Sequence, residues 1–306
     1  THDAADTLPQ WTPCGKWILF LSTRSGSSQV WRIPADGGEA TQVTKAPLDV
    51  DALQVSPTGE FLAFSMAVFP GKTPAETKAM LDERENAKAS GMIYDRLMVR
   101  EWDTWKDGTR NHLFVYDLES AKATDLMRAM DADCPTKPFG GAEDYAISPD
   151  GSHIAFSARD AGREEAWSTN YDLYAVPSDG SSAPRKLTTS PAWDAQPRFS
   201  PSGKTLAYLA MQRAGYEADR YRIALRDWPD GKDRFVDLRA DDSPRGDRSP
   251  SDLAWSPDGK ELLCSADHVG QHALFAVDVA TGRSRMVVRD GTVVSPQFAG
   301  SGRILY

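Results

Sequence analysis

Cysteines and long hydrophobic runs are both scarce in this sequence. Only three cysteines occur among 306 residues, Cys14, Cys134 and Cys264, which is a poor basis for a disulfide framework. Cys264 lies in a strand-like run, where we expect a buried thiol that packs as a small hydrophobe. The longest apolar runs reach about five residues, whereas a membrane-spanning helix needs roughly 18–20. We therefore expect no membrane span, and we find no signal-peptide pattern at the start of the chain.

Basic residues are outnumbered by acidic ones. The chain has 35 Lys and Arg against 44 Asp and Glu, which gives a formal net charge of -9. A nucleic-acid partner requires clustered basic side chains that face phosphates, so this balance argues against one. An acidic protein is compatible with attracting cationic groups, such as the free amine of a peptide.

Catalytic and metal-binding signatures are missing as well. The sequence contains no Gly-x-Ser-x-Gly nucleophile elbow, no His-Glu-x-x-His motif, no phosphate-binding loop and no dinucleotide fingerprint. His268 and His272 are four residues apart, but Gly270 between them and the hairpin context argue against a helical metal pair. Asp131 and Asp133 are typical of solvated loop residues. We therefore predict no catalytic residue, no metal site and no cofactor in this chain.

What the sequence does contain is an internal repeat. Each copy has an apolar residue, then Ser-Pro-x-Gly or Thr-Pro-x-Gly, then a short run of strand-forming residues. Proline presets the first central position of a turn, and glycine accepts a positive φ at its end. Each copy therefore predicts a turn that leads into a strand. The turn glycines of the five copies and of a degenerate sixth are Gly15, Gly59, Gly151, Gly203, Gly259 and Gly302.

A second pair of strands completes each repeat, as residues 29–33 and 41–44 do in the first copy. Four strands in about 40–55 residues is the geometry of a propeller blade. A β-sandwich or a solenoid does not explain one turn motif at a constant place in a four-strand unit. We predict an all-β propeller over residues 1–306, with about five blades and part of another. Because propellers close, we expect a piece of a longer polypeptide; a closed ring of five or six blades is the alternative.

One gap in the repeat is about twice the usual length. It separates Gly59 from Gly151, yet it contains only the one strand pair that the blade still needs, in residues 111–127. We therefore predict an insertion at residues 69–111 and not a lost blade. A second irregular stretch, residues 163–170, occupies the corresponding place in the Gly151 blade. We expect the two loops to emerge on the same face.

The insertion begins with the features of a helix start. Thr73 is a candidate N-cap, Pro74 suits the first helical position, and Glu76 completes a capping box. Residues 75–89 are rich in helix-forming residues, and Gly91 follows as a candidate stop. The sequence therefore predicts one helix in an otherwise β protein.

The two irregular stretches hold the candidate ligand-binding residues, because long loops in repeat folds are often binding elements. Clustered carboxylates could hold a substrate's ammonium group, and tryptophans could form pocket walls. Structural alternatives remain open: Trp102 and Trp105 as packing anchors, Arg96 and Arg100 as partners of surface carboxylates, and Glu165 as a solvated residue. The predicted substrate-binding residues are Arg96, Arg100, Trp102, Asp103, Trp105, Glu165, Trp167 and Asn170.

The repeat turns, such as Trp-Ser-Pro-Asp-Gly-Lys at residues 255–260, resemble those of the prolyl oligopeptidase family of serine peptidases and of TolB-like periplasmic propellers. Residues 94–115 and 165–174 make the resemblance more specific, because they are similar to one branch of this family. Their Arg-Glu-Trp-Asp-Thr-Trp and Glu-Ala-Trp-Ser-Thr-Asn segments are similar to the dipeptidyl-peptidase V and acylaminoacyl-peptidase branch. The resemblance covers essentially the whole chain.

This resemblance implies a two-domain enzyme that hydrolyses short peptides. The propeller would filter and bind the substrate, while a C-terminal α/β-hydrolase domain, absent from this chain, would carry Ser, Asp and His. The resemblance also implies a periplasmic or secreted location, with the cytoplasm as the alternative, and leaves room for a homodimer. The rival hypothesis is a stand-alone TolB-like propeller that acts as a scaffold for protein partners.

Overall fold

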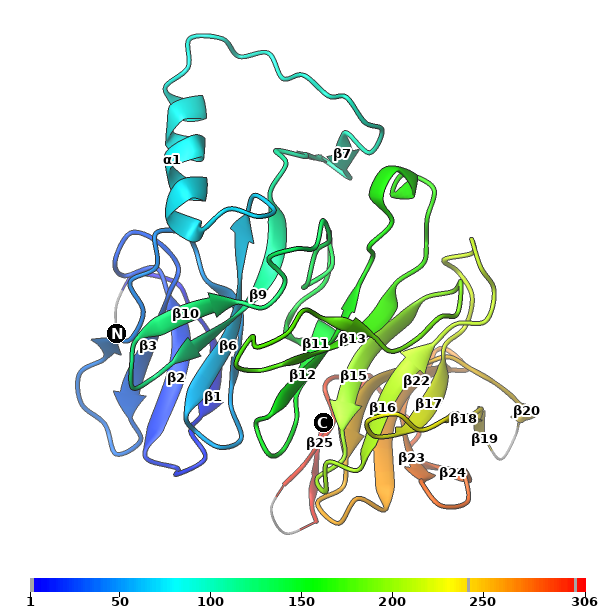
Figure 1. The fold of residues 1–306 in the computed structure, drawn as a ribbon. Helices are drawn as coiled ribbons and strands as arrows, with labels where there is room; N and C mark the ends of the chain where they lie inside the picture. Colours follow the sequence, from blue (N-terminus) through cyan, green and yellow to red (C-terminus); the bar gives the residue numbers. More distant parts are fainter. Residues whose placement is uncertain (1–2, 241–242, 300–301) are drawn as a thin grey trace. The chain divides into compact units, whose positions relative to one another are not determined.

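The computed structural model describes residues 3–240, 243–299 and 302–306 (Figure 1). Two compact units make up the chain. The first contains residues 1–154, 158–168 and 174–185, and the second contains the remaining residues up to 306. None of the helices in the described part is long and apolar enough to cross a membrane.

The first unit contains two complete four-stranded antiparallel sheets. The second of these has the strand order β10-β9-β6-β5, because the insertion separates β6 from β9 along the chain. These two strands nevertheless pair over eight residues, from Phe61 opposite Asp117 to Val68 opposite Arg110. The strands are β1 (Asp6–Trp11), β2 (Trp17–Ser22), β3 (Gln29–Pro34), β4 (Thr41–Gln42), β5 (Asp51–Val55), β6 (Phe61–Val68), β9 (Arg110–Asp117) and β10 (Lys122–Asp125).

Three further four-stranded sheets follow along the chain. Two-stranded pairs, β19 (Leu238–Ala240) with β20 (Ser243–Arg248) and β25 (Gln297–Phe298) with β26 (Ile304–Leu305), accompany them. The five four-stranded sheets confirm the predicted β-propeller fold. Their strands are β11 (Tyr145–Ile147), β12 (His153–Ala158), β13 (Asp172–Pro177), β14 (Arg185–Lys186), β15 (Asp194–Phe199), β16 (Thr205–Ala210), β17 (Arg222–Asp227), β18 (Asp233–Val236), β21 (Pro250–Trp255), β22 (Glu261–His268), β23 (Gln271–Asp278) and β24 (Ser284–Val288).

The repeated turn owes its geometry to its serine and glycine. In the third blade, the Ser148 hydroxyl donates to Asp150 at 2.6 Å and accepts a hydrogen bond from the backbone N–H of His153 at 2.9 Å. Gly151 has a φ of +72°, and a Cβ there would lie 2.9 Å from a methyl carbon of Thr58. Glycine is therefore required both by the backbone conformation and by the neighbouring turn.

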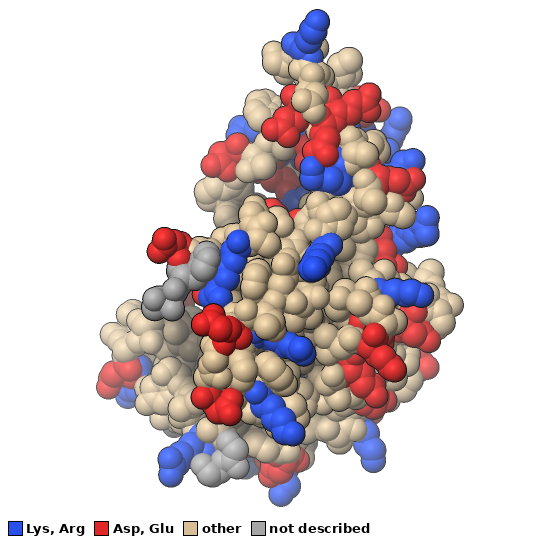
Figure 2. Space-filling view, turned by 90° about the vertical axis from the view of Figure 1, so that its left-hand side faces the viewer, with Lys and Arg blue, Asp and Glu red and all other residues tan. Residues whose placement is uncertain are grey.

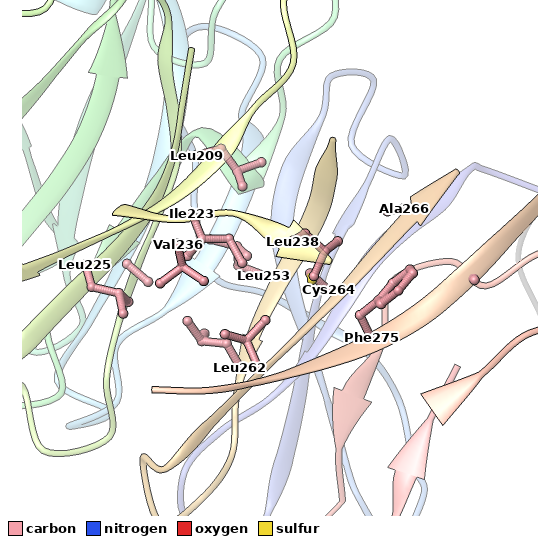
Figure 3. Packing of buried hydrophobic residues seen from close by; sticks show 13 residues of the cluster. Leu209, Ile223, Leu225, Val236, Leu238, Leu253, Leu262, Cys264, Ala266 and Phe275 are labelled. Atoms are coloured by element: carbon pink, nitrogen blue, oxygen red, sulfur yellow. The ribbon is translucent and has the colours of Figure 1, made fainter. Parts of the chain in front are cut away.

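Apolar side chains of the central strands form the core of each unit. Figure 3 shows the cluster of the second unit, in which Leu209, Ile223, Leu262 and Phe275 come from β16, β17, β22 and β23. Cys264 belongs to the same cluster and is fully buried, and burial raises the pKa of its thiol to about 12. All three cysteines are free. The sequence-based expectation of a packed thiol and no disulfide is confirmed.

The predicted helix forms, but it is shorter than expected. Helix α1 spans Pro74–Glu85, and Thr73 and Glu76 make both hydrogen bonds of the capping box, at 3.2 and 2.8 Å. The helix ends at Asn86, whose side-chain amide donates to the carbonyl oxygen of Asp82 at 2.7 Å. The expected extension to residue 89 is therefore wrong, because the asparagine side chain competes for a helix carbonyl before Gly91 is reached.

Two short elements complete the irregular stretches. After α1, the insertion continues as an extended segment and then forms a hairpin of β7 (Arg100–Glu101) and β8 (Thr104–Trp105). The second stretch contains a single 3-10 turn, η2 (Gly162–Glu164), between β12 and β13. In Figure 1, the β7 hairpin lies beside this turn. The contacts between them define the candidate site.

Candidate functional site

Ion pairs join the two irregular stretches within the first unit. The ammonium of Lys106, which follows β8, lies 2.8 Å from Oε1 of Glu165, which follows η2. Arg110, the first residue of β9, donates to both carboxylate oxygens of Glu165, at 2.6 and 2.9 Å. The expectation that the two loops emerge together on one face is therefore confirmed.

Arg110 is the centre of this network. Its guanidinium is buried and also donates to Asp131 and to Asp133, each at 2.8 Å. Burial would lower the pKa of Arg110, but the hydrogen bonds that it donates to Glu165 and the nearby negative charges outweigh burial and raise the pKa. The guanidinium therefore stays charged, and its planar fork fixes the orientation of three carboxylates.

The same contacts that raise the pKa of Arg110 lower the pKa of Glu165. Burial alone would raise its pKa, but the hydrogen bonds and charges of Arg110 and Lys106 lower the pKa to about 2. Glu165 is thus an ionised, oriented carboxylate at neutral pH. Glu165 is therefore not a solvated surface residue, which was the structural alternative for it.

The sequence-based interpretation of Asp131 and Asp133 as solvated loop residues is wrong. Asp133 is only 7% exposed and also contacts Lys137 at 3.2 Å, while Asp131 bridges Arg110 and Arg96. Both aspartates lie more than 20 positions from Arg110 along the chain, and β9 and the loop after β10 bring them together. Nothing in their local sequence indicated this partner.

Three carboxylates lie close enough together to ligate a cation. One oxygen each from Glu101, Asp133 and Glu165 lies within 4.8 Å of the others. However, the ammonium of Lys106 and the guanidinium of Arg110 already occupy the space that these oxygens face. The arrangement therefore suits nitrogen cations that donate hydrogen bonds better than it suits a metal ion.

A cavity of about 1080 Å³ lies next to the network. The C-terminal half of α1 and residues 89–98 form one side, and Lys106, Arg110, Asp131 and Glu165 contribute charged groups. Figure 2 shows acidic and basic side chains close together around the hollowed region at the top of the view. A cavity of this size is large enough for a short peptide or another small ligand.

The other charged candidates have partners of their own, and of these Arg96 alone is among the residues that line the cavity. Arg96 lines the cavity and pairs with Asp131 at 3.0 Å. The guanidinium of Arg100 donates to the backbone carbonyl of Trp102 within the hairpin. Asp103 accepts a hydrogen bond from the hydroxyl of Thr104 at 3.3 Å. Arg100 and Asp103 therefore shape the hairpin turn.

The three candidate tryptophans are strongly exposed, at 71% for Trp102, 59% for Trp105 and 68% for Trp167. The ring of Trp102 meets another exposed ring, Phe139, edge to face at a centroid distance of 5.1 Å, and Trp105 lies 6.0 Å from Tyr94. Exposed indoles on neighbouring loops are typical of contact surfaces.

Asn170 belongs to the second unit and has a different environment. Its side-chain amide donates to Asp172 at 3.2 Å, and Lys186 pairs with the same carboxylate oxygen at 2.6 Å. The structure therefore brings Arg96, Glu165 and the hairpin residues together in one unit, and it places Asn170 in the other.

Comparisons with known proteins agree with this fold. No family model matches the chain. A dipeptidyl-peptidase 5 of Porphyromonas gingivalis is 30% identical over 291 residues, which is 94% of this chain and 41% of that protein. A dipeptidyl-peptidase 5 of Trichophyton equinum is 32% identical over 331 residues, covering 99% of this chain and 44% of that protein. The chain thus spans less than half the length of these relatives.

Solved structures share the fold at low identity. An acylaminoacyl peptidase in complex with Z-Gly-Gly-Phe-chloromethyl ketone has a TM-score of 0.65 at 13% identity, over 96% of this chain and 40% of that one. TolB from Acinetobacter baumannii has a TM-score of 0.55 at 16% identity, over 96% of this chain and 57% of that one. The likeness to these structures supports the fold, and the sequence similarity supports the family. Together they show that this chain is a propeller domain of the dipeptidyl-peptidase 5 branch of the prolyl oligopeptidase family.

Proposed function

We propose that this propeller gates and binds substrate for a serine exopeptidase that releases dipeptides from short peptides. Catalysis would reside in an α/β-hydrolase domain of the same polypeptide. The similarity to dipeptidyl-peptidase 5 proteins more than twice as long supports both parts of the proposal. The observation that carries it is the cavity of about 1080 Å³ lined by the first insertion and by Glu165 of the second irregular stretch, which Arg110 binds to that insertion.

A stand-alone scaffold fits the observations less well. TolB is 16% identical to this chain, whereas the dipeptidyl-peptidase 5 of Porphyromonas gingivalis is 30% identical over 94% of it. The reading frame that encodes these residues discriminates between the two functions. A following hydrolase domain with a nucleophile elbow supports the peptidase, whereas a stop codon directly after Tyr306 supports the scaffold.

Kinetics of the full-length protein test the proposed binding site. We expect Trp102→Ala to raise KM for dipeptide-releasing substrates by about tenfold, because a rigid aromatic contact is lost. Glu165→Gln should raise KM as well. Trp11→Ala is the matched control, since Trp11 is also exposed (60%) but lies on β1, outside the insertions. Equal KM values for wild type, Trp102→Ala and Glu165→Gln would remove these loops from the substrate pocket.

A further inference from the structure

His112 on β9 is a buried titratable residue that contacts the loop after β10. This loop, residues 126–134, carries two of the carboxylates that bind Arg110. It returns alongside β9, where the backbone N–H of Cys134 donates to the carbonyl oxygen of Asn111 at 2.8 Å. The side chain of His112 has no exposed surface. Its ring therefore packs between the strand and the loop.

Both ring nitrogens of His112 face hydrogen-bond acceptors. Nδ1 lies 3.0 Å from Oδ2 of Asp125, and Nε2 lies 3.2 Å from the carbonyl oxygen of Met130. The other carboxylate oxygen of Asp125 accepts a hydrogen bond from the backbone N–H of Met127 at 2.8 Å. A neutral imidazole has one N–H and satisfies one of these acceptors, whereas an imidazolium donates to both. The arrangement therefore fits an imidazolium that is paired with an ionised Asp125.

The charge that faces His112 comes from one neighbouring strand. Asp125 ends β10 and forms the ion pair with the ring. On the other side of β9, the residue of β6 opposite His112 is the uncharged Met66. Arg128, on the loop itself, is exposed, and its charge interacts with Glu76 of α1. The charged state of the ring therefore depends on Asp125.

Met130 connects His112 to the wall of the cavity. It directly precedes Asp131 in sequence, and Asp133 follows two positions later. Both aspartates accept a hydrogen bond from Arg110 at 2.8 Å, and Asp131 and Arg110 line the cavity. A shift of the Met130 carbonyl would therefore move the carboxylates that orient Arg110.

We propose that His112 is a positioning residue whose imidazolium holds the loop 126–134 in the conformation that orients Arg110. Loss of the proton leaves the neutral ring bound to Asp125, because a hydrogen bond to a carboxylate is the stronger one. A lone pair then faces the carbonyl oxygen of Met130, and the middle of the loop is released. The proposal rests on the proposed function and adds that substrate binding weakens as the pH rises through the titration of His112.

Nitrogen NMR of the 306-residue chain with 15N-labelled histidine tests the protonation of the ring. The signals of His112 are assigned from nuclear Overhauser contacts with Met130. As the pH rises, the wild-type ring should pass from two N–H groups to one, and the remaining proton should lie on Nδ1, which faces Asp125. A neutral ring protonated on Nε2, or a ring that does not titrate while the chain is folded, would overturn the proposal.

Asp125→Asn changes the expected tautomer without removing the contacts. The new amide donates to Nδ1, so the neutral ring can donate from Nε2 to the carbonyl oxygen of Met130. His112 should therefore lose its proton at a lower pH than in wild type, and the remaining proton should lie on Nε2. Identical titrations and tautomers in the two proteins would contradict the assigned role of Asp125.

Asp179→Asn is the matched control. Asp179 is exposed in the turn after β13, where it accepts a hydrogen bond from the backbone N–H of Ser181 at 2.9 Å. This variant makes the same change in charge away from the loop, so His112 should titrate as in wild type. An equal shift in Asp179→Asn would attribute the effect to net charge and overturn the proposal.

Kinetics of the full-length protein connect the proton to the cavity. The KM of wild type divided by that of Asp125→Asn should rise at least about threefold as the pH passes through the titration of His112, with the ratio of kcat values unchanged. The ratio cancels pH effects that both proteins share, such as those of catalytic groups. A constant KM ratio would overturn the positioning role, whereas the Trp102→Ala kinetics test the proposed function separately.

Discussion

At the scale of single residues, the most consequential contact is the fork of hydrogen bonds between Arg110 and Glu165. The two residues are 55 positions apart in sequence and come from different blades. A bidentate arginine–carboxylate pair sets both distance and angle. The contact therefore fixes one insertion loop against the other and sets the position of the cavity wall.

The depressed pKa of Glu165 makes this contact pH-dependent. Because the pKa of Glu165 falls to about 2 in the folded chain, from an ordinary value of about 4.5, the stabilisation is fully present above pH 4.5. It is lost as the pH falls from about 4.5 towards 2. We expect Glu165→Gln to lower the free energy of unfolding by about 3 kcal/mol at pH 7 and by less at pH 3.5.

Urea unfolding of the two proteins at several pH values measures this difference. Glu164→Gln is the control, because Glu164 is the exposed neighbour of Glu165 in sequence. Its free energy of unfolding should stay close to that of wild type. A Glu165→Gln effect that does not change between pH 7 and pH 3.5 would show that the carboxylate charge is not responsible.

Sequence reasoning identified Glu165 and the tryptophans as candidates but missed Arg110, Asp131 and Asp133. The candidates stood out because they interrupt a repeat, which is a local signal. Arg110 lies at the end of the insertion, and its partners are 21 to 55 positions away. Only the pairing of β6 with β9 and the loop between β12 and β13 bring these charges together, and no local pattern encodes that proximity.

At the scale of elements, local chemistry specified the turns and the start of the helix but not the hairpin. The capping box and the Pro-x-Gly turns are short motifs whose hydrogen bonds close within a few residues. The hairpin of β7 and β8 has two-residue strands. Strands this short have no detectable period, so the sequence showed only an irregular stretch.

The start of β15 carries an unusual carboxyl group. Asp194 is 2% exposed, and its Oδ2 has no hydrogen-bond partner among the described residues. Burial raises its pKa to about 7; Asp172 adds to the shift and a hydrogen bond with Thr188 opposes it. Asp172 itself is buried and pairs with Lys186.

A raised carboxyl pKa destabilises the fold as the pH increases. The folded state retains a proton that the unfolded state loses near pH 4, so stability falls between about pH 4 and pH 7. We expect Asp194→Asn to raise the free energy of unfolding by roughly 1–3 kcal/mol at pH 8 and by less at pH 5. Denaturant titrations at both pH values measure this, with exposed Asp36→Asn as the control. Equal effects at pH 5 and pH 8 would contradict the account.

At the scale of the whole molecule, the repeat predicted the blades because each blade is a local unit. Four strands and one turn motif define it, and the longest departure is the insertion that separates β6 from β9 in the second blade. The segments 94–115 and 165–174 indicated the relation of this domain to a peptidase, and the comparison with longer proteins confirmed it. Under the proposed function, hydrolysis takes place in another domain, so its chemistry leaves no signature in these residues.

Hydrogen–deuterium exchange of the chain, with and without saturating alanylalanine amide, tests the central claim most directly. Ligand binding at the paired insertions should slow exchange at residues 94–106 and 163–168, because the hairpin and the η2 loop would close on the peptide. The repeated Pro-x-Gly turns should exchange at unchanged rates and serve as internal controls. Protection confined to those turns or to the second unit, or no protection anywhere, would contradict the assignment of these loops to substrate binding.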